Sequence, residues 1–327
     1  MRLLAALALV LFAPAVAAPA AQGAPGSPST YDARVAHVRH ASAALGVERS
    51  FHIYVPPEAS EPGRRFPAVY LFRGHFREWV NKTEDVSRGG RNVVDVYEAL
   101  RAEGAIGPLI LVFPGVTAEN ADIHSAGVNM RDPGGNASVG TGRFEDYVVD
   151  DLIPFVDANY PTIADRGARG VDGYSLGGFV SVKLALQHPG LFLTVGAVDA
   201  PYFLPKKRKP GVVATKKDAI FRDPYFDAAF GVPRSATFAG ANNGLTLIST
   251  VDESVVPSLK WLIEYGPAGP NSNFDRGERL VRLIEAKGGE NLMQGAVPGF
   301  RHDWRNADEH MRRSLVLHSR LLAERPE

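Results

Sequence analysis

The sequence predicts an α/β fold in which helices cover both faces of a doubly wound, mostly parallel β-sheet. Two segments, 66–72 (FPAVYLF) and 109–113 (LILVF), are almost continuously apolar, and a segment with helical spacing, 93–103, separates them. Apolar runs without alternation are typical of strands that are covered on both faces. Because strands that alternate with helices form parallel sheets with right-handed crossovers, the order strand, helix, strand indicates this architecture.

The remaining elements extend the same pattern. Two β-rich stretches, 35–41 and 50–55, predict an antiparallel entry into the sheet. The later predicted elements are, in chain order, a helix over 144–159, a strand near 169–172, a helix over 176–187, strands over 191–198 and 259–265, a helix over 274–287, a strand over 291–297 and a helix from about 306 to 322. Between 199 and 258 the periodicity breaks down, which we interpret as a small cap insertion in one domain spanning 31–327.

The N-terminus has the pattern of a secretory signal peptide. Arg2 is followed by an apolar stretch from Leu3 to Phe12 and then by small residues. This stretch is short for a bilayer span, which needs about 20 residues, and Pro14 interrupts it. We therefore expect cleavage of residues 1–20, a flexible leader over 21–30, and a secreted or periplasmic protein without stable membrane insertion.

Composition excludes several classes of function. Lys plus Arg and Asp plus Glu both number 36, so the formal net charge is zero and no global field attracts nucleic acid. The chain has no cysteine, which excludes disulfides, a thiolate nucleophile and a cysteine-ligated metal.

The strongest chemical motif is Gly-Tyr-Ser-Leu-Gly-Gly at 173–178, which fits G-x-S-x-G. It falls between a predicted strand and a predicted helix, the context that a nucleophile elbow requires. In such an elbow the serine side chain projects from the carboxyl edge of the sheet, and its neighbours must be small. We therefore predict that Ser175 is a nucleophile; the alternative is a glycine-rich turn whose serine caps the helix.

A serine hydroxyl needs a base within hydrogen-bond reach, and His302 is our candidate. It follows the last predicted strand, in a loop that lies at the same sheet edge as Ser175. His310 and His318 fall on the final helix, where a surface or packing role explains them. His188 falls at a helix end, where capping explains it.

The carboxylate that orients the histidine is ambiguous in the sequence. Chain order places it between Ser175 and His302. Asp275, after the strand over 259–265, is our first choice, although a residue there can also cap the helix that follows. Asp199, directly after the preceding strand, is the second choice, and Glu264 is the third.

Two backbone amides are expected to form an oxyanion hole. One belongs to Leu176, after the nucleophile, and the other to His75, in the loop after the strand that ends at Phe72. Gly74 lets the backbone approach the substrate. A metal at His75 is an alternative that we disfavour, because no second ligand stands at a suitable spacing.

These residues resemble the esterase family of α/β-hydrolases that includes S-formylglutathione hydrolases, feruloyl and acetylxylan esterases, enterochelin esterase and the antigen 85 mycolyltransferases. The likeness extends from about 49 to 322 and rests on GYSLGG, on FEDYVVDDLIPFVDANYP at 144–161 and on PGFRHDW at 298–304. It implies the α/β-hydrolase fold and the same nucleophile, base and oxyanion donors. The sequence departs from the family at Arg73, where members usually have histidine or aspartate, and lacks an obvious acid motif before Asp275.

The expected function is hydrolysis of a carboxylic ester through an acyl-enzyme, with no cofactor and no metal. The substrate is expected to be a small-molecule ester or an ester of a polysaccharide or lipid. Two alternatives stay open from the sequence: transfer of the acyl group to a sugar or lipid alcohol, and a noncatalytic binding protein on a hydrolase scaffold.

Overall fold

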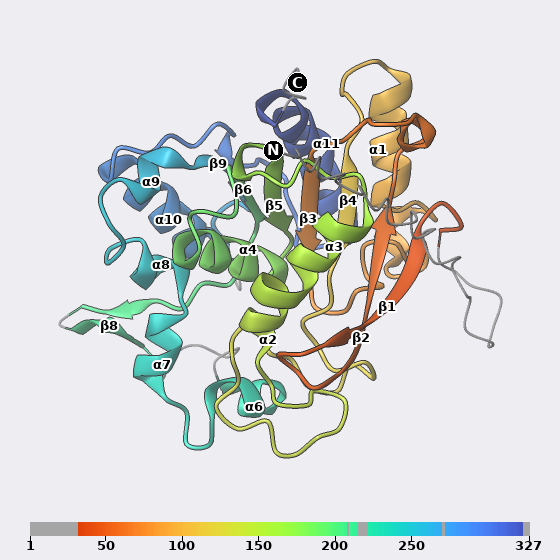
Figure 1. Cartoon of the computed structure of the whole chain (residues 1–327). Helices are drawn as coiled ribbons and strands as arrows, with labels where there is room; N and C mark the ends of the chain where they lie inside the picture. Colours follow the sequence, from red (N-terminus) through yellow and green to blue (C-terminus); the bar gives the residue numbers. More distant parts are fainter. Residues whose placement is uncertain (1–31, 208, 215–221, 270–271, 323–327) are drawn as a thin grey trace, which may run out of the picture.

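The computed structural model describes residues 32–207, 209–214, 222–269 and 272–322 (Figure 1). The expected signal peptide and leader, residues 1–30, therefore lie outside the described residues. None of the helices in the described ranges combines the length and apolar character that a membrane crossing requires.

Eight strands form one mostly parallel sheet, in the order β1-β2-β4-β3-β5-β6-β9-β10. The first three strands in this order pair antiparallel, and every later neighbour pairs parallel. The strands are β1 (Ala36–Ser42), β2 (Val47–Tyr54), β3 (Ala68–Phe72), β4 (Ile110–Phe113), β5 (Arg169–Gly173), β6 (Thr194–Val198), β9 (Lys260–Tyr265) and β10 (Gly295–Ala296). The predicted fold class and antiparallel entry are confirmed.

Helices cover both faces of this sheet, as the apolar strands predict. The longer helical elements are α1 (Val93–Ala102), α2 (Phe144–Asp146) continuing through a π-helical turn (Tyr147–Leu152) into α3 (Ile153–Asn159), α4 (Leu176–Gln187), α10 (Phe274–Ala286) and α11 (Trp304–Leu321). Figure 1 shows α1 and α11, which are far apart in the sequence, side by side on one face, and α3 and α4 on the other.

Strand β3 shows why the sheet needs two helical layers. All five of its residues are buried. Val69 and Leu71 belong to the core beneath α1 and α11, whereas Tyr70 and Phe72 belong to the core beneath α4. Because successive side chains of a strand point to opposite faces, both faces of β3 remove apolar surface from water.

Two predicted elements differ from the structure. The predicted helix over 144–159 contains the π-helical turn, and the predicted strand over 291–297 pairs only at Asn291, through one isolated bridge to Trp261, and in the short β10. The side chain of Asn291 explains the short strand: its Oδ1 accepts the Ile263 N–H at 2.8 Å, and its Nδ2 donates to the Ile263 carbonyl at 2.9 Å. A side-chain amide thus stands beside a single backbone bridge at that point, and continuous strand pairing begins at Gly295.

The segment between β6 and β9, where we expected a cap insertion, consists of short elements beside the sheet (Figure 1). These are a two-stranded sheet of β7 (Pro205–Lys206) and β8 (Lys209–Val213), followed by α6 (Asp227–Phe230), α7 (Ala236–Ala241), α8 (Gly244–Leu247) and α9 (Val255–Ser258). Helix α8 packs against α4 and α10, so this segment joins the core on the α4 face.

Candidate active site

Ser175 lies at a sharp turn between β5 and α4, at the carboxyl edge of the sheet. Its backbone has φ 55° and ψ −121°, a conformation that L-residues rarely adopt. A Cβ on Gly177 would lie 1.9 Å from the carbonyl oxygen of Phe72, so no other residue fits at this position. The glycine-rich motif therefore permits a strained turn that points the serine away from the strand.

The structure argues against a capping role for this serine. Ser175 precedes α4, but its side chain makes no capping hydrogen bond, and within the described residues its hydroxyl has no hydrogen-bond partner. Its backbone N–H donates to the Val198 carbonyl at 2.9 Å, which ties the elbow to the end of the neighbouring strand β6. The hydroxyl is thus left available for chemistry.

His302 meets Asp199, the second of our three candidate carboxylates. The His302 Nδ1 lies 2.6 Å from Asp199 Oδ2. Asp199 directly follows β6 and has φ 49°, so the neighbouring strands β5 and β6 are each followed within two residues by a residue with positive φ. The His302 ring also packs on Tyr174, with ring centroids 4.9 Å apart, which brings the imidazole beside the nucleophile elbow.

Asp199 is held as an ionised hydrogen-bond acceptor. Its Oδ1 accepts the Gly266 N–H at 3.1 Å, and its Oδ2 also accepts from the Asn273 side chain at 3.4 Å. Burial opposes ionisation, but the hydrogen bonds from His302 and Gly266 outweigh it and hold the pKa of the Asp199 carboxyl below its ordinary value. A carboxylate bound to Nδ1 fixes the tautomer of the histidine, with the proton on Nδ1 and the lone pair on Nε2.

Our first choice for the acid, Asp275, is wrong as the partner of His302. Asp275 is exposed in the first turn of α10, and the histidine hydrogen bond goes to Asp199. Helix α10 begins at Phe274, and it is the preceding Asn273, not Asp275, whose side chain reaches Asp199, so chain order alone did not locate the acid. A carboxylate in the first turn is explained by the helix dipole.

Glu264, the third choice, belongs to a buried ionic cluster instead. Its Oε2 lies 2.8 Å from His310 Nδ1, and the other ring nitrogen of His310 lies 3.2 Å from Asp172 Oδ1. His318 Nε2 lies 3.2 Å from the second oxygen of Asp172. Both histidines are therefore buried beneath β5 and β9 and are not on the surface.

Two carboxylates determine the charge of His310. Burial opposes its protonation, but Asp172 and Glu264 outweigh burial and raise the pKa of His310 to about 9. His188, for which we expected a capping role, ends α4 and lies 2.9 Å from Glu145 Oε1.

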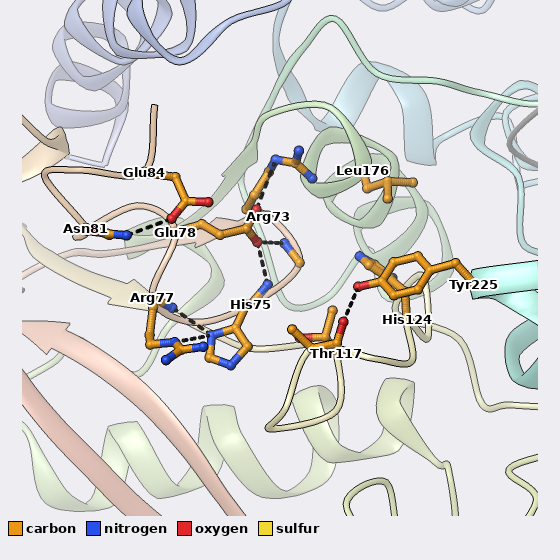
Figure 2. A pocket seen from close by; sticks show the side chains of 12 residues that line it. Arg73, His75, Arg77, Glu78, Asn81, Glu84, Thr117, His124, Leu176 and Tyr225 are labelled. Carbon is orange, nitrogen blue, oxygen red and sulfur yellow. Dashed lines mark hydrogen bonds and ion pairs between the residues drawn. The ribbon is translucent and has the colours of Figure 1, made fainter. Parts of the chain in front are cut away.

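The loop after β3 brings the amide of His75 to the cavity that also contains Leu176 (Figure 2). This amide is already engaged: the N–H groups of Gly74 and His75 donate to Glu78 Oε2 at 2.8 and 2.5 Å. The sequence did not indicate this contact, although a Glu three residues after a turn residue is a known capping pattern.

Arg88, which the sequence analysis overlooked, anchors this loop. Its guanidinium donates to the carbonyls of Glu78 at 2.9 Å and Trp79 at 3.1 Å, and it binds Asp308 on α11 with distances of 2.7 and 2.9 Å. The Arg88 side chain is fully buried. The loop that carries the His75 amide is therefore fastened to the last helix by one buried ion pair.

A cavity of about 510 Å³ opens beside the elbow and is lined mostly by polar side chains. Its walls are Arg73, Gly74, His75, Arg77, Glu78, Asn81, Glu84, Thr117, Ala121, His124, Leu176 and Tyr225. In the described part of the chain, no three His, Asp or Glu side chains are grouped so that they could hold a metal ion.

A mostly parallel sheet that carries a strained serine between a strand and a helix is the α/β-hydrolase fold. Solved structures with this likeness include a ferulic acid esterase, with a TM-score of 0.67, 17% identity and coverage of 89% of this chain and 99% of that one. The S-formylglutathione hydrolase of Agrobacterium tumefaciens matches with a TM-score of 0.58 at 16% identity, over 88% and 95% of the two chains. At these identities the likeness shows the fold.

The family follows from the sequence match. The family model Esterase, described as "Putative esterase", matches residues 42–241, and the chain belongs to this family. Among curated relatives, Esterase Rv1288 of Mycobacterium tuberculosis is 26% identical over 170 residues, which are 52% of this chain and 33% of that protein. S-formylglutathione hydrolase of Mus musculus is 26% identical over 176 residues, 48% and 54% of the two chains. The chain thus spans between a third and about half of the length of these relatives.

Proposed function

We propose that this protein is a serine esterase that hydrolyses a carboxylic ester through Ser175, His302 and Asp199. The observation that carries the proposal is the 2.6 Å hydrogen bond between His302 and Asp199 beside a strained serine elbow. Membership of the esterase family supports the same reaction class.

The reaction begins when His302 Nε2 takes the proton of the Ser175 hydroxyl as the serine attacks the ester carbonyl. In the unliganded structure no hydrogen bond joins these two described side chains, and such contacts often form only when substrate is bound. Asp199 stabilises the imidazolium that results. The alcohol leaves with the proton from His302, and an ester bond to Ser175 remains.

Water then repeats the sequence on the acyl-enzyme. His302 removes a proton from water, the hydroxide attacks the acyl carbonyl, and the carboxylic acid leaves as Ser175 recovers its proton. The amides of Leu176 and His75 stabilise the oxyanion in both steps. Removal of one such donor typically costs about 100 to 1000-fold in rate.

The proposal includes export from the cytoplasm and a single catalytic domain with a cap insertion at about 199–258. Export rests on the apolar stretch from Leu3 to Phe12 and the small residues that follow it. N-terminal sequencing of the protein secreted by the native cell tests this part: a start near residue 18 or 21 supports it, and a retained Met1 contradicts it.

Hydrolysis of p-nitrophenyl esters from acetate to palmitate tests the catalytic part. The purified mature protein should turn over at least one ester, and Ser175→Ala should not. Ser254→Ala, an exposed serine in a turn whose side chain binds Asp252, is the matched control and should keep full activity. Equal activity of wild type and Ser175→Ala would refute the proposal.

A further inference from the structure

The carboxylate of Glu78 lies on the backbone amides that the proposed reaction needs. Its Oε2 accepts the N–H of His75 at 2.5 Å and the N–H of Gly74 at 2.8 Å (Figure 2). The distance from Gly74 is that of a charge-assisted hydrogen bond, and the contact with His75 is closer still. The His75 amide therefore has an anionic acceptor before any substrate arrives.

This contact matters because an oxyanion hole works by preorganised donors that are aimed at developing negative charge. An N–H group that points at a carboxylate does not stabilise a second anion equally well. A fixed negative charge at this place also repels the alkoxide that forms in the transition state. As long as Glu78 keeps this position, the hole retains the Leu176 amide but loses the His75 amide.

Two buried donors without hydrogen-bond partners flank the Glu78 carboxylate. Arg73 Nε lies 3.6 Å from Glu78 Oε1, and it is buried without a hydrogen bond to any described residue. His124 Nε2 is likewise buried and unpartnered among the described residues, and the side chain is 2% exposed. Buried donors in native proteins normally have a hydrogen-bond acceptor, so the lack of an acceptor at these two nitrogens requires an explanation.

The Glu78 carboxylate and the His124 donor lie beside the same point. A Cβ on Gly74 would lie 3.0 Å from Glu78 Oε2 and 3.0 Å from His124 Nε2. His124 Nδ1 accepts the Ala126 N–H at 2.8 Å, so the ring proton resides on Nε2. Burial, followed by the charge of Arg73, lowers the pKa of His124 to about 3, and the ring is a neutral donor at working pH.

We propose that the Glu78 carboxylate blocks the His75 amide of the oxyanion hole in the unliganded enzyme. When substrate binds, the ester carbonyl displaces the Glu78 carboxylate toward Arg73 and His124. This inference rests on the proposed function. The displaced carboxylate would shorten its existing ion pair with Arg73 into a hydrogen bond and gain a hydrogen bond from His124, which offsets the loss of the two amides. The competing explanation is that Glu78 is a permanent cap that holds the turn in shape.

The test compares Glu78→Ala and Glu78→Gln with wild type in the rate at which a small p-nitrophenyl phosphonate labels Ser175, followed by release of p-nitrophenol and by mass spectrometry. The phosphonate oxygen occupies the oxyanion hole, so its reaction reports on the free amides. Glu78→Ala opens the hole and should raise the second-order rate constant about tenfold, the size expected for one charged hydrogen bond. Glu78→Gln keeps a neutral acceptor on the amides and should fall between.

Asp252→Ala is the matched control, because Asp252 accepts the Ser254 N–H at 2.9 Å in an exposed turn far along the chain. Its labelling rate should stay within twofold of wild type. The inference is overturned if Ser175 is labelled more slowly in both Glu78→Ala and Glu78→Gln than in wild type. It is also overturned if Glu78→Gln is unchanged while Glu78→Ala has both a lower melting temperature and a lower labelling rate. Either result would show that Glu78 is a cap that holds the turn in shape. If wild type itself is not labelled and Ser175→Ala behaves identically, the proposed function has failed instead.

A double-mutant comparison tests whether His124 donates a hydrogen bond to the displaced Glu78 carboxylate or only packs against its neighbours. His124→Asn keeps an acceptor for the Ala126 N–H but removes the Nε2 donor. It should slow labelling severalfold in wild type, because the displaced carboxylate loses a donor, and should have no effect in the Glu78→Ala background. An equal loss in both backgrounds would overturn the role of His124 as the receiving donor.

Discussion

Replacement of Asp199 by asparagine should nearly abolish esterase activity while it leaves the fold intact. Asparagine has the same shape as aspartate, and its Oδ1 can still accept the Gly266 N–H, which lies 3.1 Å from Asp199 Oδ1. The amide nitrogen then faces His302 Nδ1 in place of the oxygen at 2.6 Å. Two N–H groups cannot face one another, so Nδ1 becomes the acceptor and the ring proton moves to Nε2.

The magnitude follows from this change of tautomer. A histidine that carries its proton on Nε2 cannot accept the proton of Ser175. In a Ser-His-Asp triad the same replacement lowers kcat roughly 10,000-fold. Four factors of ten correspond to about 5 kcal/mol of transition-state stabilisation. Asp199 Oδ2 makes a short bond and its side chain is 4% exposed, so solvent screens the Asp199 end of this contact only weakly.

The assay is p-nitrophenyl acetate hydrolysis at saturating substrate, with circular dichroism to verify folding. Asp275→Asn is the matched control, because Asp275 also follows a strand at the same sheet edge but is exposed. It should keep kcat within twofold and lose at most about 1 kcal/mol of stability from the helix dipole. Asp199→Asn with kcat within tenfold of wild type, or Asp275→Asn with a loss above 100-fold, would refute the assignment of Asp199.

Three further outcomes are expected. Arg88→Ala should lower the free energy of unfolding by about 3–5 kcal/mol in urea titrations, because it leaves the Asp308 carboxylate buried without its partner; a loss below 1 kcal/mol would contradict this role. Gly177→Ala should eliminate Ser175 labelling and lower the melting temperature, because its Cβ would lie 1.9 Å from the carbonyl oxygen of Phe72; a normal labelling rate would show that the elbow tolerates a side chain. The pKa of His310 is raised to about 9, above its value in the unfolded chain. The contribution of His310 to stability should therefore be complete below about pH 6.5 and should disappear as the pH rises through 9. Urea titrations over this pH range check this, and the control variant His310→Gln should lose this pH dependence.

The local parts of the site could be predicted from the sequence. The elbow at 173–178 is a contiguous motif whose steric demands act within one turn, and α4 begins and ends where its spacing predicts. His302 was placed by chain order, because the carboxyl ends of parallel strands meet at one edge of the sheet. Strands β3 and β4 could be predicted from their continuous apolar sequences, because a strand with two covered faces has no polar positions.

The partner of His302 could not be predicted in this way. Asp199 and Asp275 both follow predicted strands between Ser175 and His302, so chain order allowed either, and Asp275 was ranked first. The structure decides between them through the strand order, since β6 lies beside β5 and the Ser175 N–H bonds to Val198, the residue before Asp199. Strand adjacency is a long-range property that no local pattern contains.

The sequence by itself therefore predicted the serine elbow at 173–178 and the kind of fold that carries it, because those properties depend on neighbours within a few positions. The tertiary structure decided which carboxylate orients His302, that Glu78 covers the His75 amide, and that Arg88 ties this loop to α11. Each of these contacts depends on how loops are brought together by the sheet and its helices. Their free energies come from burial and charge at that meeting point, which exist only after the chain has folded.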